Sequence, residues 1–361
     1  MSMANEIKNI SEKDDSNFFV RFVKYFVPWK GDKSAEVVRK IVFIFSIFIF
    51  VFSINELTDF LKSDQEQINY AQEIVKYEPN FDDLNLNDVS GNAEDGDDNP
   101  ESTVKERKVQ SWAKELLNRN DEVVGWIKIP GFVNSDGEEY INFPVLQHVT
   151  DNIEEGNNYY LKRNIDEEFY DSGSIYADCV VPIDENGQAD NITIYGHHMR
   201  RLGTSFTHLA EYKDGVDFLK KYPVIEFNTI YDSGEKYVIV GCFVAAAEDY
   251  QDDIPIFDYW RYRNFDDDEY SFESWIDNVR KQLWYSSDVE CTEDDDYISL
   301  STCSNEVSDM RWVIVAKKMT ADDNLDLIVD SYEEKDDKDI YFPKCWRDVW
   351  GNNKKYLGWS Y

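Results

Sequence analysis

The sequence is poor in cysteine and histidine, with five of one and four of the other among 361 residues. The cysteines are widely separated, so no CxxC pair and no metal-ligand spacing occurs: Cys179, Cys242, Cys291, Cys303 and Cys345. An odd count leaves at least one thiol free even if the others paired. The pattern therefore implies no disulfide scaffold.

Positive charge is also scarce, since Lys and Arg number 37 against 73 Asp and Glu, which gives a formal net charge of −36. Phosphate contacts need clustered Lys and Arg, so this balance argues against a nucleic-acid partner. It suits a soluble, self-repelling surface and says little about the fold. The chain is long enough for one or two domains, and it contains no internal repeat.

One long apolar run is present near the N-terminus. Ile41–Ile54 is uncharged and almost wholly apolar, and Val37 and Phe60 extend it towards the roughly 20 residues of a membrane span. The alternatives are a buried core helix and a cleaved signal peptide, but no small-x-small cleavage site follows. We expect a single-pass anchor in the cell membrane over residues 37–60. Basic residues precede it and acidic ones follow, which predicts a cytoplasmic tail over 1–36 and the bulk of the chain outside.

Residues 61–103 are predicted to form an acidic flexible stalk. The stalk starts with a short polar helix over about 61–76 and continues with a segment rich in Asp, Asn, Glu and Gly. Such a segment buries too little apolar surface to offset the entropy lost on ordering, and like charges extend it. A calcium loop is the alternative, although no D-x-D-x-D-G-x5-E pattern occurs.

Over residues 104–320 the pattern changes to short strands between turns, after a helix expected over 104–118. The expected strands cover 123–129, 140–147, 174–178, 191–197, 224–230, 236–246, 298–302 and 311–316, and helical segments are expected over 205–212, 214–221 and 268–283. Many short strands with few helices favour a mainly β barrel or sandwich. An acidic, aromatic C-terminal extension over 321–361 either packs back on this domain or binds a partner.

Two neighbouring strand ends carry candidates for chemistry. The alternation in Ile298–Thr302 puts Ser299, Ser301 and then Cys303 on the polar face, where a substrate could reach the thiol. Arg311 opens the next strand and could return its guanidinium to the same edge. A cysteine beside an arginine suggests a nucleophile next to an anion-stabilising group. The alternative is a half-buried core cysteine beside an ordinary surface arginine.

A third strand ends in the same way. The alternation over 191–197 puts Tyr195 and His197 on its polar face, so His197 ends that face as Cys303 ends the other. Strand parity favours His197 over His198 as the partner of the thiol. The alternative is a surface histidine with ordinary hydrogen bonds.

The order of these residues restricts the chemistry. Every histidine precedes Cys303, so the papain-like order is excluded if Cys303 is the nucleophile. The remaining order is histidine, cysteine, arginine, with arginine in place of a carboxylate. This set suits acyl transfer: a thiolate attacks a carbonyl, an imidazolium protonates the departing amine, and a guanidinium binds the substrate or the developing oxyanion.

With these residues assembled, the chain resembles a class B sortase, a cysteine transpeptidase of Gram-positive bacteria. The resemblance covers roughly residues 108–318 and rests on Val124–Pro130, Phe143–Gln147, Tyr159–Leu161, Gly173–Tyr176, Tyr195–His197 and Leu300–Cys303 with Arg311. It implies a mainly β fold, a sortase-type closed β-barrel with peripheral helices, preceded by an N-terminal transmembrane helix.

The resemblance also implies roles for the site residues. Cys303 would cleave the C-terminal sorting signal of a surface protein and form a thioester, His197 would be the acid and base, and Arg311 would bind the substrate and stabilise the oxyanion. Tyr195 and Ser301 match positions that line the family's active site and bind substrate. The acceptor would be a peptidoglycan amine, and no cofactor or metal is expected. The alternatives are a catalytically inactive extracellular module that binds wall polymer or a partner protein, and a cysteine peptidase that hydrolyses its thioester.

Overall fold

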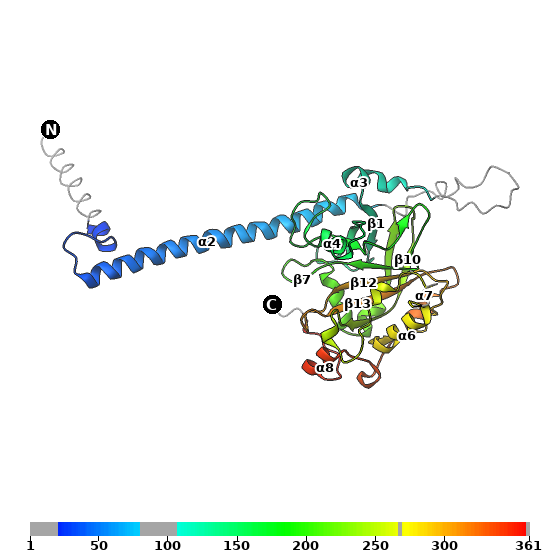
Figure 1. Cartoon of the computed structure of the whole chain (residues 1–361). Helices are drawn as coiled ribbons and strands as arrows, with labels where there is room; N and C mark the ends of the chain where they lie inside the picture. The colour runs from blue at the N-terminus through cyan, green and yellow to red at the C-terminus, as the bar shows by residue number, and fades with distance from the viewer. Residues whose placement is uncertain (1–20, 80–106, 266–268, 359–361) are drawn as a thin grey trace. The chain divides into compact units, whose positions relative to one another are not determined.

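The computed structural model describes residues 21–79, 107–265 and 269–358. The chain divides into two compact units, one up to Glu66 and one from Gln67 onwards. The second unit carries the barrel (Figure 1). Most of the predicted acidic segment, the calcium-loop alternative within it and the start of the helix expected at 104 lie outside the described residues.

The apolar run forms part of a single long helix, α2 (Ser34–Ile74), continued by η1 (Val75–Tyr77). Within the described residues, one helix is long and apolar enough to cross a membrane: Ser34–Tyr77, whose most apolar window has a mean hydropathy of 2.4. Its apolar side chains from Ile41 to Ile54 are exposed, which is the pattern of a helix that faces lipid rather than a protein core. The N-terminal apolar helix is therefore a candidate membrane span.

The last part of α2 packs on the second unit. The Gln67 side-chain oxygen accepts hydrogen bonds from the backbone and hydroxyl of Ser172, at 3.1 and 3.0 Å, and the Tyr70 hydroxyl donates to Asp166. The expected polar helix over 61–76 is thus the C-terminal end of α2. The folded unit begins at Gln67, inside the segment 61–103 that the sequence predicts to be a stalk.

Among the described residues, eight strands close into a barrel in the order β1-β2-β3-β6-β12-β13-β10-β9. They are β1 (Val123–Lys128), β2 (Asn142–Leu146), β3 (Ile175–Ala177), β6 (Asn191–Tyr195), β9 (Val224–Thr229), β10 (Lys236–Ala245), β12 (Tyr297–Cys303) and β13 (Arg311–Lys318). Each coincides with a strand expected from the period-two pattern, so the mainly β barrel is confirmed. The pairs are antiparallel except β2–β3 and β6–β12.

Three two-stranded sheets and several helices surround the barrel (Figure 1). Two of them are hairpins, β4 (Ile183–Asp184) with β5 (Gly187–Gln188) and β7 (His198–Met199) with β8 (Thr204–Ser205), and the third pairs β11 (Tyr285–Ser286) with β14 (Glu333–Glu334). The α-helices are α3 (Lys114–Arg119), α4 (Ile153–Tyr159), α5 (Val216–Lys221), α6 (Phe272–Gln282), α7 (Leu325–Ser331) and α8 (Lys344–Trp350). The 3-10 turns are η3 (Ser111–Ala113), η4 (Tyr160–Lys162), η5 (Thr207–Lys213), η6 (Asp249–Gln251), η7 (Tyr259–Arg261) and η8 (Asp337–Asp339).

Two helices start later than the sequence predicts. The helix expected from 104 begins only at Ser111, because the backbone of Gln110 is extended and its N–H donates to the carbonyl of Ile230. The helix expected from 268 begins at Phe272, because the Ser271 hydroxyl caps its first turn by accepting from the backbone of Ser274. Tertiary contacts and a cap therefore set both boundaries.

The polar face predicted for β12 is not open along its length. Ser299 and Ser301 are buried, and only Cys303 at the strand end is partly exposed. The Ser299 hydroxyl is hydrogen-bonded to Asn191 and the Ser301 hydroxyl to Tyr259. Buried hydroxyls need such partners, so this face is an internal polar layer with one accessible end.

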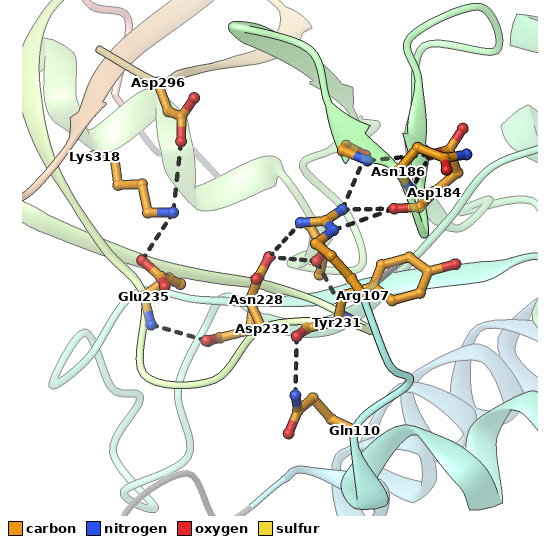
Figure 2. A network of polar contacts seen from close by, with 12 residues as sticks. Arg107, Gln110, Asp184, Asn186, Asn228, Tyr231, Asp232, Glu235, Asp296 and Lys318 are labelled. Carbon is orange, nitrogen blue, oxygen red and sulfur yellow. Dashed lines mark hydrogen bonds and ion pairs between the residues drawn. The ribbon is translucent and has the colours of Figure 1, made fainter. Parts of the chain in front are cut away.

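A network of polar contacts joins elements at the end of the barrel opposite Cys303 (Figure 2). Arg107 donates to the carbonyls of Asp184 and Gly187, at 2.8 and 2.9 Å, and lies 3.3 Å from the Asp232 carboxylate. Lys318, at the end of β13, pairs with Glu235 and Asp296. Arg107 thus joins the start of the domain to the β4–β5 hairpin and the β9–β10 turn.

The C-terminal extension packs back on the barrel, as one of the two sequence hypotheses expects. Trp346 of α8 is fully buried, and its ring centroid lies 5.9 Å from that of Trp284. The Trp350 indole donates to the carbonyl of Glu306. Trp359 and Tyr361 of the same extension lie outside the described residues.

Replacing Arg107 by Ala is expected to lower the free energy of unfolding by about 1–3 kcal/mol, because two carbonyls lose a charged donor. Urea unfolding monitored by tryptophan fluorescence measures the change. Lys338→Ala is the control, since Lys338 pairs only with exposed carboxylates at the surface and should shift the midpoint little. An unchanged midpoint for Arg107→Ala would show that the network in Figure 2 contributes no stability.

Candidate functional site

Strand register brings the three predicted catalytic residues to one end of the barrel. Cys303 pairs directly with Arg311 across the antiparallel β12–β13 ladder. On its other side β12 runs parallel to β6, with Ser301 opposite Tyr195. The Gly196 N–H continues this pairing by donating to the Ser301 carbonyl at 3.1 Å. His197 follows Gly196 directly and lines the same groove as Cys303.

The guanidinium of Arg311 lies beside the thiol. Its Nη1 is 4.0 Å from Sγ of Cys303 and donates to the carbonyl of Asp309 at 3.0 Å. Both side chains are partly exposed. A guanidinium at this distance has N–H donors available for an oxyanion that develops near the sulfur.

His197 lies just beyond β6 and lines the same groove as Cys303 and Arg311. Its Nε2 lies 2.8 Å from the carbonyl oxygen of Leu161. A carbonyl only accepts, so Nε2 carries a proton, and Nδ1 of the neutral ring is left as an acceptor. Burial lowers the pKa of His197, so the neutral ring predominates at neutral pH.

The neighbouring His198 has a different role. Its Nδ1 lies 2.9 Å from the backbone carbonyl of Cys303, and its side chain does not line the groove. The contact ties β7 to the end of β12. The structure places His197 in the groove and His198 against the backbone of Cys303.

The two weaker sequence candidates also line the groove, with their hydroxyls already engaged. The Tyr195 hydroxyl donates to the fully buried carboxylate of Asp178 at 3.1 Å, and burial raises the Tyr195 pKa well above its usual value. The Ser301 hydroxyl lies 2.6 Å from that of Tyr259 and is 1% exposed. These contacts make Tyr195 and Ser301 parts of the groove wall.

The groove itself has a volume of about 360 Å³. Its floor carries Cys303, Arg311, His197, Tyr195 and Ser301, and its walls come from α4 and from the connection between β10 and α6. The wall residues include Asn157, Leu161, Ala246, Phe257, Tyr259 and Trp260. A groove of this volume, lined by aromatic side chains and a thiol, can hold a short peptide segment with one carbonyl at the sulfur.

Several of these wall residues have no counterpart among the sequence candidates. Tyr259 and Trp260 lie in a long connection without helical or strand periodicity, so no pattern links them to Cys303. Asp178 is held by Asn157 and Arg263 as well as by Tyr195. Asp178 itself does not line the groove, and its burial is seen only in the structure, where a buried carboxylate needs several partners.

Within the part of the chain that the structure describes, no group of three His, Cys, Asp or Glu side chains is arranged to hold a metal ion. The five cysteines are all unpaired. Burial raises the pKa of the Cys242 and Cys291 thiols, to about 11 for Cys291, which keeps both protonated at neutral pH. The site described above is therefore a thiol, an imidazole and a guanidinium around a peptide-sized groove, the constellation of a cysteine acyltransferase on a sortase-type barrel.

Comparison with known proteins agrees with this class. The chain is 31% identical over 200 residues to the sortase B of Listeria monocytogenes and 28% identical over 200 residues to that of Staphylococcus aureus. Each alignment covers 55% of this chain and 70% of the relative. A search of protein-family models found no match.

Solved structures of sortase B share the fold. A Staphylococcus aureus sortase B–substrate complex superposes with a TM-score of 0.52 at 24% identity, covering 72% of this chain and 99% of that one. A Bacillus anthracis sortase B superposes with a TM-score of 0.50 at 21% identity, covering 73% and 99%. Together with the curated relatives, these findings show that the chain belongs to the sortase B family.

The burial of His198 predicts a pH dependence of stability. Burial lowers the His198 pKa to about 4, although its hydrogen bond to Cys303 opposes the shift. An unfolded histidine binds its proton near pH 6.5. The free energy that the buried, neutral His198 contributes to folding is therefore fully present above pH 6.5. It is lost as the pH falls from 6.5 towards 4.

Urea unfolding at pH 7 and pH 5 measures this loss. We expect wild-type protein to lose more stability between the two than His198→Asn, which cannot gain a proton but can still donate to the Cys303 carbonyl. Equal losses in the two proteins would contradict a buried, neutral His198.

Proposed function

We propose that this protein is a membrane-anchored cysteine transpeptidase. It cleaves a C-terminal sorting signal through a thioester on Cys303 and joins the surface protein to a peptidoglycan amine. The observation that carries the proposal is the register of β6, β12 and β13, because it brings an imidazole and a guanidinium to either side of one partly exposed thiol.

In the first half-reaction, the Cys303 thiolate attacks the scissile carbonyl of a peptide in the groove. The C–S bond forms, and the carbonyl oxygen becomes an oxyanion that accepts hydrogen bonds from the Arg311 guanidinium. The protonated His197 ring donates a proton to the amide nitrogen. The C–N bond then breaks, so the C-terminal fragment leaves as an amine and the thioester remains.

In the second half-reaction, an acceptor amine attacks the thioester carbonyl. Neutral His197 takes a proton from the amine, the C–S bond breaks, and Cys303 leaves as a thiolate. The lowered pKa of His197 supports the second step, because a neutral ring is the form that accepts a proton. The same shift makes the imidazolium needed in the first step a minor species at neutral pH.

We further propose that this chemistry takes place outside the membrane, with the following domain organisation. Residues 1–36 form a cytoplasmic tail, 37–60 the span, 61–103 an acidic connection, 104–320 the catalytic domain and 321–361 an extension. The apolar, exposed side chains of α2 and the basic residues before them support this topology. Substrates would be surface proteins with a sorting signal, and lipid would contact only the N-terminal helix.

Replacing Cys303 by Ala is expected to abolish cleavage of a sorting-signal peptide, because no nucleophile remains. Cys291→Ala is the matched control and should keep wild-type activity, since Cys291 lies away from the groove. A fluorogenic peptide assay measures both variants. Retained cleavage by the Cys303 variant would end the proposal.

Replacing Arg311 by Ala is expected to lower kcat by about 100- to 1,000-fold, because the oxyanion loses its donors. Arg311→Lys keeps the charge but not the forked donors, and we expect it to recover only part of the loss. The same assay, with circular dichroism as a folding control, gives the comparison. Equal activity in Arg311→Ala and wild type would remove Arg311 from the mechanism.

Product analysis separates transfer from hydrolysis. With a peptide substrate and a rising concentration of an added amine, the ligated product should increase and the hydrolysed product decrease, because both derive from one thioester. Liquid chromatography with mass detection quantifies the two products. A hydrolysed fraction that does not respond to the amine would favour a peptidase.

A further inference from the structure

A buried ion pair joins the loop 304–310, which connects the cysteine and arginine strands, to the 3-10 turn η5. Nζ of Lys213 lies 2.5 Å from Oε2 of Glu306, and both side chains are 0% exposed. Neither side chain lines the groove. Burial lowers the Lys213 pKa to about 8, with Glu306 opposing the shift, so the ammonium stays charged at neutral pH.

The ammonium also holds the residue that follows the nucleophile. Lys213 Nζ donates to the Ser304 carbonyl at 2.9 Å, and the Ser304 hydroxyl donates to the same Glu306 carboxylate at 2.8 Å. The Ser304 N–H closes the loop by donating to the carbonyl of Met310. Lys213, Ser304 and Glu306 thus form one hydrogen-bonded unit next to Cys303.

The residue that follows the arginine belongs to the same cluster. Lys213 Nζ lies 4.9 Å from the centroid of the Trp312 ring, a cation–π distance. The Trp312 indole donates to the carbonyl of Leu209, also in η5, at 2.9 Å. One turn of 3-10 helix therefore contacts the backbone neighbours of both Cys303 and Arg311.

The loop is held in a strained shape that decides where the guanidinium lies. Asn305 and Asp309 have left-handed backbones, with φ of 64° and 63°. Asn and Asp adopt this region more readily than other residues with a Cβ, and the contacts around the loop hold it in this shape. The Asp309 carbonyl accepts the hydrogen bond of Arg311 Nη1, so a change in loop shape moves the guanidinium relative to the sulfur.

Two further contacts hold the same loop from other parts of the domain. The Gln251 side chain donates to the Ser308 carbonyl at 3.0 Å, and the Trp350 indole of the C-terminal extension donates to the Glu306 carbonyl at 3.3 Å. These neutral hydrogen bonds reach the loop from outside. The ion pair is the charged contact that holds the loop to η5.

We propose that Lys213 and Glu306 are positioning residues for the pair formed by Cys303 and Arg311. This inference rests on the proposed transpeptidase function. A buried ion pair is weak evidence for stability, since two apolar side chains of similar volume often serve as well. Its defined geometry instead keeps loop 304–310 in one shape and the guanidinium beside the sulfur.

The test is the double substitution K213M/E306L, which removes both charges without leaving one of them buried and unpaired. We expect kcat for a sorting-signal peptide to fall by about tenfold to a hundredfold, because the guanidinium is no longer held in place. KM should stay within about twofold, because the groove residues are unchanged. Amide hydrogen exchange of loop 304–310 should be about tenfold faster than in wild type.

The matched control is K317M/D323L. Lys317 is a similarly buried lysine, 6% exposed and 3.1 Å from Asp323, at the other end of β13 from Arg311. We expect the K317M/D323L variant to be less stable than wild type but to have the same kcat per folded molecule. Glu306→Gln keeps an oxygen that can accept from Lys213, so its kcat and loop exchange should lie between wild type and the double variant. It also serves as the test if the double variant does not fold.

Unchanged kcat and unchanged loop exchange in a folded K213M/E306L or Glu306→Gln variant would overturn the inference. An equal loss of kcat in K317M/D323L would also overturn it, since the effect would then follow stability alone. If wild-type protein cleaves no sorting-signal peptide, the proposed function fails, and the hydrogen exchange of loop 304–310 still decides whether the ion pair holds the loop.

Discussion

The site depends on the pairing of β12 with two different neighbours. Its antiparallel partner β13 sets Arg311 opposite Cys303, and its parallel partner β6 brings the chain at His197 to the same level. Backbone hydrogen bonds fix both registers, and a slip of one residue would turn every side chain of β12 to the other face. The β12–β13 ladder therefore holds Cys303 and Arg311 side by side, and the β6–β12 pairing brings in His197 from much earlier in the sequence.

The remaining interactions refine this arrangement. Leu161 sets the tautomer of His197, and Asp309 orients Arg311. The internal polar layer formed by Ser301 and Tyr259 closes the groove below the thiol. Each of these contacts is a hydrogen bond with a group that lies on a strand or on a loop held by several other contacts.

The sequence alone predicts those features of the fold and the site that follow from short-range periodicity. The period-two pattern identifies all eight barrel strands, and the strand ends identify Cys303, His197 and Arg311 as neighbours. The period-two pattern does not predict which residues of these strands are exposed to solvent. Ser299 and Ser301 alternate like a solvent face, yet they are buried: the Ser299 hydroxyl bonds Asn191 of β6, and the Ser301 hydroxyl bonds Tyr259 of the connection after β10. Tyr259 was not found for the same reason, since that connection has no periodicity.

The ion pair of Lys213 and Glu306 was also beyond the sequence. The two residues lie 93 positions apart, and each is a charged residue of a type that is usually found on the protein surface. Only the fold shows that both are buried beside the loop that joins the catalytic strands. Sequence periodicity therefore does not predict which polar residues are buried by distant parts of the chain. The contacts that hold the site in shape are among those that it misses.

Mass spectrometry of the intact protein after incubation with a panel of sorting-signal peptides tests the central claim most directly. The account predicts a covalent adduct with the mass of the N-terminal peptide fragment, mapped to Cys303 and released by hydroxylamine, as a thioester requires. An adduct at another cysteine, or no adduct with any peptide that is cleaved, would contradict it.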